Sequence, residues 1–251
     1  MKNLVLLLFV FSIIACSDDN FSRSDFERQR INEVAETPPI GKKIKKMNDR
    51  FGEHQYYYNS SGFIDSIYSR YRGQNSSGFD SFSIHKFNYN KSNKLIFIAN
   101  LNAEGSIENP INKNESENHF TYNKLNQIIE EHYYIKSNGS TQTTKYEYNN
   151  DGSLKSNNKY YLNGNLIVEK SNNEVYTYSH NDKTNPFYNI YTKAYKAIRS
   201  IDKNDRILIE RTADNGTSYA EYFITYDSDN YKIKEHLKYP VVDFYSTYEY
   251  Y

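Results

Sequence analysis

The stretch YYYNSSGFIDSI, from Tyr56 to Ile67, decides the fold because its pattern returns along the chain. Tyr58 is followed at once by Asn59, and Gly62 stands four residues after Tyr58. Related stretches recur at intervals of 23 to 33 residues, centred on Tyr58, Tyr89, Tyr122, Tyr148, Tyr178, Ile201 and Tyr226. A pattern that recurs in this way is typical of a scaffold built from repeated structural units.

Each unit carries the chemistry of a tight turn. The residue after the central position is polar in every unit: Asn59, Asn90, Asn123, Asn149, Ser179, Asp202 and Asp227. Such residues favour the first position of a type I turn. The fourth residue tolerates positive φ in every unit: Gly62, Asn93, Asn126, Gly152, Asp182, Asp205 and Asn230. A type I turn followed by a left-handed residue predicts a β-hairpin with a bulge.

The hairpin geometry predicts one apolar face. The central residue should lie opposite the sixth residue after it, and paired residues share a face of the sheet. That sixth residue is aliphatic in five units: Ile64, Leu95, Ile128, Leu154 and Ile207. Two residues before the centre, on the same face, stand Tyr56, Phe87, Phe120, Tyr146, Tyr176 and Ile224. The residues between them are mostly polar, so the other face should contact water.

Two units depart from the pattern. Lys232 replaces the aliphatic residue after Tyr226. Thr184 does so after Tyr178, and Asn185-Pro186-Phe187 follows it. Apolar residues then recur every four positions, which predicts a short helix near 188–200. We expect the sheet to break or to be capped there.

Simpler hairpin signals lie between the units. Asn138-Gly139, Asn163-Gly164 and Asn215-Gly216 are dipeptides typical of two-residue hairpin loops. Together the two kinds of turn predict an all-β fold, an antiparallel meander of roughly a dozen strands, given usual strand lengths. So long a meander should be strongly curved or closed into a barrel. We assign residues 40–251 to this single domain.

The first fifteen residues have the features of a signal peptide. Their apolar run, Leu4 to Ile14, is shorter than the about 20 residues of a transmembrane helix. Cys16 follows and is the only cysteine, so the chain cannot form an internal disulfide. Residues 16–39 carry many charges and few large apolar side chains, and we interpret them as a flexible tether.

The end of this signal, Ile13-Ile14-Ala15-Cys16, resembles the lipobox of bacterial lipoproteins. The resemblance implies cleavage before Cys16 and acylation of its thiol, with palmitate as a typical chain. Acyl chains would then anchor the protein to the membrane. Ser17-Asp18-Asp19 resembles the surface-export signal of Bacteroidota lipoproteins, which implies the outer membrane and its exterior face. A plain polar tether, with the periplasmic face, remains the alternative.

The repeats resemble known sequences as well. The form Tyr-x-Tyr-Asn/Asp-x-x-Gly-x-Leu/Ile, as in YEYNNDGSL from Tyr146 to Leu154, resembles the YD repeats of Rhs-type proteins. With the lipobox and Asn185-Pro186-Phe187, residues 40–251 are more similar to a family of uncharacterised Bacteroidota surface lipoproteins. That resemblance implies a porin-like β fold and no established activity.

No sequence motif indicates a catalytic, metal-binding or nucleic-acid-binding site. Lys and Arg together number 31 and so do Asp and Glu, which does not favour nucleic acid as a partner. The six histidines have no metal-ligand spacing, and we expect His54, His85 and His119 to lie in strands. We predict no catalytic residue, metal or cofactor. The 27 tyrosines leave stacking on sugars open as a form of binding.

The sequence therefore favours an outer-membrane-anchored lipoprotein that is a non-catalytic binding or structural module. Its ligand, a glycan or a protein, and its oligomeric state are left open. A transmembrane β-barrel is the first alternative, although a mean hydropathy of −0.88 supplies a lipid-facing band poorly. A glycan-degrading enzyme is the second, and it would require two carboxylates across one cleft.

Overall fold

The computed structural model describes residues 35–72, 80–105 and 110–251. The predicted signal peptide, Cys16 and the tether up to residue 34 lie outside the described residues. The chain divides into two units, Met1–Glu33 and Val34–Tyr251, and the fold described here is that of the second. Within the described ranges no helix has the length and apolar character needed to cross a membrane.

The described residues form one antiparallel sheet of fifteen strands, which confirms the predicted meander with more strands than expected. The first eight strands are β1 (Ile44–Asn48), β2 (Gly52–Tyr58), β3 (Ile64–Tyr71), β4 (Ser81–Tyr89), β5 (Leu95–Gly105), β6 (Pro110–Tyr122), β7 (Ile128–Ile135) and β8 (Thr141–Lys145). The other seven are β9 (Lys159–Leu162), β10 (Asn165–Ser171), β11 (Glu174–Thr184), β12 (Asn204–Ala213), β13 (Gly216–Tyr226), β14 (Lys232–Lys238) and β15 (Asp243–Tyr250).

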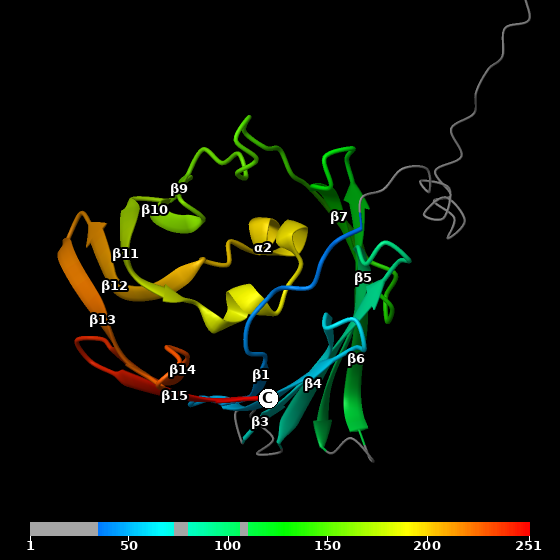
Figure 1. Cartoon of the computed structure of the whole chain (residues 1–251), viewed down its shortest axis with the longest axis horizontal. Coiled ribbons are helices and arrows are strands. Elements are labelled where there is room, and N and C mark those ends of the chain that lie inside the picture. Colours follow the sequence, from blue (N-terminus) through cyan, green and yellow to red (C-terminus); the bar gives the residue numbers. More distant parts are fainter. Residues whose placement is uncertain (1–34, 73–79, 106–109) are drawn as a thin grey trace, which may run out of the picture. The chain divides into compact units, whose positions relative to one another are not determined.

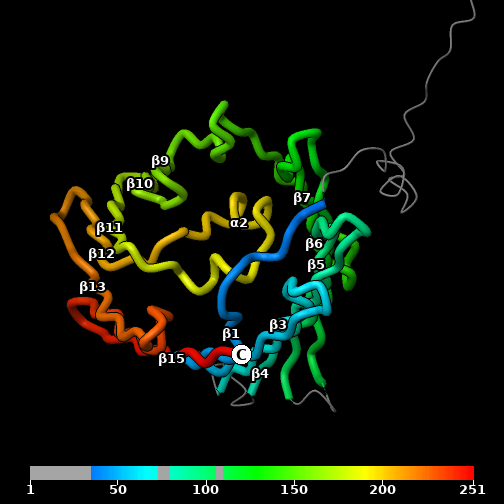
Figure 2. Tube along the Cα trace, in the orientation of Figure 1, coloured from blue at the N-terminus to red at the C-terminus, as the bar shows by residue number. Residues whose placement is uncertain are grey.

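The order of the strands brings the two ends of the domain together. β1 pairs with β2 on one side and with β15 on the other. β8 and β9, which are neighbours in the sequence, stand at the opposite ends of the described sheet. Figure 1 shows the sheet curving around a helical segment in its interior. In Figure 2 the connection from β8 to β9 spans the opening between these ends, so the sheet is strongly curved and open.

The predicted turn geometry is confirmed in five units. Tyr58 pairs with Ile64 across a register shift, as expected for a central residue opposite the sixth residue after it. The side chain of Asn59 accepts from the N–H of Ser61 and of Phe63, at 3.0 and 3.1 Å. The predicted left-handed residues have positive φ at Gly62 (81°), Asn93 (58°), Asn126 (60°), Gly152 (83°) and Asn230 (64°).

Hairpins are confirmed at all three Asn-Gly positions, but of the three dipeptides Asn163-Gly164 alone forms the two-residue loop itself. Asn138-Gly139 lies between β7 and β8, and Asn163-Gly164 joins β9 to β10 with φ of 52° and 83°. Between β12 and β13, Ala213 pairs with Gly216, so the two-residue loop is Asp214-Asn215 and Gly216 begins the strand.

Two predicted turns are wrong. β11 runs through Asp182, and Asp205 lies inside β12. The carboxylate of Asp205 is fully buried and lies 2.7 Å from Nζ of Lys232, so this ion pair holds the residue in a strand against its turn preference. The sheet does not break at this point, because β11 and β12 pair with each other.

The segment between β11 and β12 folds back into the concavity. It consists of the 3-10 helix η1 (Pro186–Asn189) and, after an interruption, the helix α2 (Lys193–Arg199), which confirms the short helix predicted near 188–200. The interruption occurs because Thr192 adopts an extended conformation and caps α2, its hydroxyl accepting from the N–H of Tyr195 at 3.3 Å.

The core lies between this segment and strands β1 to β7. Ile190, Ala194 and Ile198 pack against buried strand residues that the repeat pattern placed on the apolar face: Tyr56, Ile64, Phe87, Leu95, Phe120 and Ile128. The face of the sheet that they share is called the concave face below, and the opposite one the convex face.

Four repeat tyrosines, together with Tyr250 of β15, bind the sheet together at the end where the turns lie. Each donates its hydroxyl to a backbone carbonyl of the neighbouring strand: Tyr58 to Ile44 (2.9 Å), Tyr89 to Ile64 (2.8 Å), Tyr122 to Leu95 (2.9 Å), Tyr148 to Ile128 (2.7 Å) and Tyr250 to Lys232 (2.7 Å). We call these five contacts the tyrosine bonds.

The tyrosine bonds form where the backbone hydrogen bonds between neighbouring strands end. The pairing of β3 with β4 stops at Ser66 and Lys86, which leaves the carbonyl of Ile64 beyond the ladder. The hydroxyl of Tyr89 donates to that carbonyl at 2.8 Å, beyond the last backbone pair of the two strands. A buried carbonyl without a partner would be destabilising, so the tyrosine permits the backbone pairing to end before the turn.

We predict that Tyr89→Phe lowers the free energy of unfolding by about 1–3 kcal/mol, because it leaves the carbonyl of Ile64 without a donor. Tyr219→Phe is the matched control, since the Tyr219 side chain is 51% exposed. Chemical denaturation of both variants provides the measurement. Equal stability of the two would contradict the proposed role of the tyrosine bonds.

We also predict that Asn126→Ala costs about 1–2 kcal/mol, because a left-handed backbone strains alanine. Asn126→Gly should be nearly neutral, since glycine adopts positive φ freely. Denaturation midpoints of the two variants test the turn. If alanine were tolerated as well as glycine, the left-handed position would not constrain the fold.

Candidate functional site

The concave face changes character along its strands. Near the turns it is apolar and covered by the helical segment, where Tyr195 contacts Phe87 and Phe120 with ring centroids 6.2 and 5.8 Å apart. Farther from the turns the paired residues on this face are polar, as His54 with Ser69 and His85 with Asn100. The covered part is core, and the polar part borders a cavity.

This cavity has a volume of about 550 Å³ and lies beside α2. Its polar lining consists of His54, Ser69, His85, Asn100, Asn102, Ser116, Asn118 and Arg199. Aromatic rings line it as well, from Tyr56, Phe87, Tyr133, Tyr191 and Tyr195. Cavities of this size that combine apolar walls with a few polar groups are typical of ligand-binding sites.

A chain of hydrogen bonds crosses four strands in the wall of the cavity. Nδ1 of His85 lies 2.7 Å from Oδ1 of Asn100. Nδ2 of Asn100 donates to Oδ1 of Asn118 at 2.8 Å, and Nδ2 of Asn118 donates to Oε1 of Glu131 at 2.7 Å. We call these four residues, on β4 to β7, the amide relay. It fixes the orientation of side chains that would otherwise rotate freely.

The amide relay ends at a buried carboxylate. Glu131 is 6% exposed and accepts from the guanidinium of Arg199, on α2, and from the hydroxyl of Tyr146 at 2.5 Å. A buried charge is stable only when it is paired and hydrogen-bonded, and Glu131 has both kinds of contact. The same contacts attach α2 to the sheet and thereby set one wall of the cavity.

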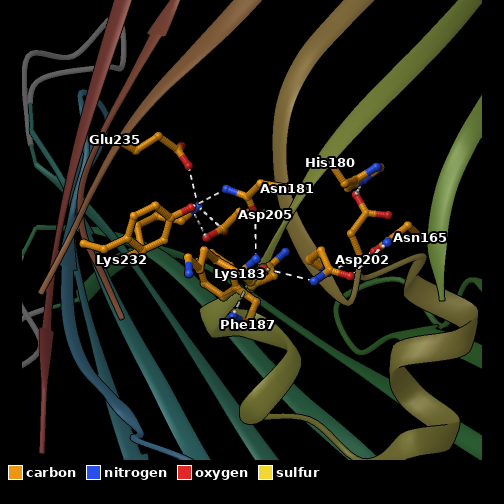
Figure 3. A network of polar contacts seen from close by, with 12 residues as sticks. Asn165, His180, Asn181, Lys183, Phe187, Asp202, Asp205, Lys232 and Glu235 are labelled. Carbon is orange, nitrogen blue, oxygen red and sulfur yellow. Dashed lines mark hydrogen bonds and ion pairs between the residues drawn. The ribbon is translucent and has the colours of Figure 1, made fainter. Parts of the chain in front are cut away.

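The concave face of strands β11 to β14 carries a different network of polar side chains, shown in Figure 3. Nζ of Lys232 lies 2.7 Å from Asp205 and 2.5 Å from Glu235, and all three side chains are buried or nearly so. The hydroxyl of Tyr226 donates to Asp205 at 2.9 Å and accepts from Nδ2 of Asn181 at 2.6 Å. Burial raises the pKa of Asp205 above its ordinary value, although Lys232 opposes this effect.

Asp202 organises the neighbouring part of the same face. Its Oδ1 accepts from the N–H of Leu166 at 2.7 Å, and its Oδ2 accepts from Arg206 at 2.6 Å. Nε2 of His180 lies 3.2 Å from Oδ2. Burial alone would raise the pKa of Asp202, but His180, Arg206 and the Leu166 N–H together hold it below its ordinary value.

The two polar regions have different roles. Around Asp202 and Lys232 the charged groups bind one another, so this region holds β10 to β14 and the end of the helical segment in place. The cavity beside α2 is lined by amides, hydroxyls and imidazoles, several of them bonded to one another in the amide relay, and by aromatic rings. We take this cavity as the candidate binding site. Among the described residues, no group of three or more His, Cys, Asp and Glu could hold a metal ion.

Sequence reasoning had located few of these residues. Cys16, the one site residue predicted, lies outside the described residues. His54, His85 and His119 lie in β2, β4 and β6 as expected. The cavity residues were missed, although the sequence contains their signal. His54, His85 and Asn118 each stand four residues before a repeat tyrosine, which places them on the concave face by the alternation of a strand.

Of the comparisons with known proteins, the one with solved structures found similar chains. No protein-family model and no curated protein matches the chain. Among solved structures, a porin-like protein from Bacteroides uniformis ATCC 8492 is similar, with a TM-score of 0.41 and 9% sequence identity. The match covers 86% of this chain and 100% of that chain.

We predict that acid removes the contribution of Asp202 to stability. Its pKa is lower in the folded than in the unfolded chain, so its ionised form stabilises the fold above about pH 4, and this contribution is lost as the pH falls. At pH 6 the free energy of unfolding of the wild type should exceed that of Asp202→Asn by about 1–3 kcal/mol. The difference should shrink towards pH 2. Denaturation at several pH values tests this, and a pH-independent difference would contradict it.

Proposed function

We propose that this protein is a lipid-anchored module of the outer membrane that faces the cell exterior and binds a glycan, without catalysis, in the cavity beside α2. The observation that carries the proposal is the lining of this cavity. It combines amide and hydroxyl side chains with the rings of Tyr133, Tyr191 and Tyr195. Sugars present hydroxyls at their edges and C–H groups on their faces, so polar groups and aromatic rings together fit them.

The convex face supports a domain surrounded by water over the transmembrane alternative. Ion pairs on this face join Lys46 to Glu53, Arg70 to Asp80, Lys136 to Glu117 and Lys145 to Glu130. Several of these residues directly adjoin concave-face residues, as Glu53 adjoins His54 and Arg70 adjoins Ser69, so they point the other way. Strands that face lipid need an apolar outer band, which charges on many strands oppose.

The chemistry of the lining supports binding over hydrolysis. Glycosidases act through two carboxylic groups that flank the scissile bond. The polar groups that line the cavity in the described residues are imidazoles, amides, hydroxyls and one guanidinium. Glu131 lies behind them, engaged by Asn118, Arg199 and Tyr146. These groups suit hydrogen bonding to a sugar.

A glycan-array screen of the full-length chain, purified in a detergent that contains no sugar, tests the binding site. We predict that Tyr133→Ala abolishes binding, because Tyr133 lines the cavity. Tyr134→Ala should leave binding unchanged, because the adjacent residue on β7 points to the convex face and is 37% exposed. Binding that survives Tyr133→Ala but not Tyr134→Ala would place the site on the wrong face.

Fractionation of cells that express Cys16→Ser tests the anchor. Without an acylated Cys16 the chain should leave the membrane fraction, because acyl chains would supply the membrane affinity. If Cys16→Ser resisted extraction by alkaline carbonate, the strands themselves would be embedded in lipid. That result would support the transmembrane alternative and contradict the proposal.

A further inference from the structure

We infer that the cavity beside α2 selects neutral carbohydrates and discriminates against acidic ones such as uronates. This inference rests on the proposed function and specifies the class of ligand for the same site. It follows from the direction of the hydrogen bonds in the amide relay and from the pairing of Arg199 with Glu131.

The amide relay has one direction. Glu131 is an acceptor, so Asn118 must turn its amide nitrogen towards it and its oxygen towards Asn100. Asn100 in turn donates to Asn118 and presents its oxygen to His85. Nδ1 of His85 must therefore carry the proton that is donated to Asn100.

This direction determines what His85 offers to a ligand. In a neutral imidazole with the proton on Nδ1, Nε2 is an acceptor. His85 lines the cavity, so its free acceptor suits a donor such as a sugar hydroxyl. A carboxylate has no proton to donate at neutral pH and would meet a lone pair instead.

The cation of the cavity is already engaged. Of the described lining residues, Arg199 is the one with a permanent charge, and Glu131 accepts its hydrogen bond from the wall behind. The Arg199 side chain is 35% exposed, whereas that of Glu131 is 7% exposed. An acidic sugar would have to compete with Glu131 for Arg199 and would be repelled by that buried carboxylate.

Glu131→Gln should therefore change the specificity. The glutamine can still accept from Asn118 through its carbonyl oxygen, but it no longer neutralises Arg199. We expect affinity for an acidic oligosaccharide, for example a uronate tetrasaccharide, to rise about tenfold, which corresponds to ~1.4 kcal/mol. Affinity for a neutral tetrasaccharide should change less than this.

Glu117→Gln is the matched control. Glu117 lies on the neighbouring strand β6, but on the convex face, where it pairs with Lys136 at 3.0 Å. It should bind both oligosaccharides as the wild type does. Affinities are measured by calorimetric titration of the full-length proteins, after circular dichroism has established that each variant is folded.

A second measurement needs no variant and no ligand. The ¹⁵N chemical shifts of the His85 ring should report a protonated Nδ1 and an unprotonated Nε2 in the wild type. The opposite tautomer would overturn the inference about the relay even if Glu131→Gln failed to fold.

The outcomes separate this inference from the proposed function. Wild-type protein that binds neutral glycans about tenfold or more tightly than acidic ones supports both. Wild-type protein that binds the two classes equally, or prefers the acidic one, contradicts the selectivity while leaving glycan binding intact. If no glycan of either class bound, the proposed function itself would fail.

Discussion

The tyrosine bond between a repeat tyrosine and the carbonyl of the neighbouring strand is the interaction on which the rest of the structure depends. Backbone ladders between successive hairpins stop short of the turns, and the hydroxyl of a residue such as Tyr89 satisfies the carbonyl left beyond the ladder. Phenylalanine would fill the same space but could not make the bond. The contact occurs between β1 and β2, β3 and β4, β5 and β6, and β14 and β15, and Tyr148 makes it to β7. It lets the backbone pairing end before the turns without leaving buried acceptors unpaired.

The end of the sheet near the turns forms the apolar half of the concave face, and this determines where a site can form. The helical segment packs on the aromatic and aliphatic residues near the turns. Its Tyr191 and Tyr195 contact Phe87. Because the helical segment covers only that end, the polar residues farther along the strands border a cavity. The contact of Arg199 with Glu131 then joins the helix to the amide relay. The contact that attaches α2 to the sheet therefore also forms one wall of the candidate site.

Much of this fold could be predicted from local patterns. The turns at Gly62 and Asn93, and the pairing of Tyr58 with Ile64, follow from the chemistry of a few adjacent residues. The cavity could not be predicted, because it depends on contacts between distant residues. Glu131 and Arg199 are 68 positions apart, and nothing near either identifies the other. A distant partner also explains one of the two wrong turns, because the ion pair with Lys232 outweighs the local turn preference of Asp205. Lys232, at a position where most units carry an aliphatic residue, was the signal of this ion pair in the sequence.

A crystal structure of the full-length protein with a neutral oligosaccharide tests the central claim, that the cavity beside α2 is the binding site, most directly. We predict a sugar ring against Tyr133 and a sugar hydroxyl about 3 Å from Nε2 of His85, the usual length of a hydrogen bond. The tyrosine bonds and the amide relay should be unchanged in the complex. A sugar bound to the convex face, with the cavity occupied by water alone, would contradict the claim.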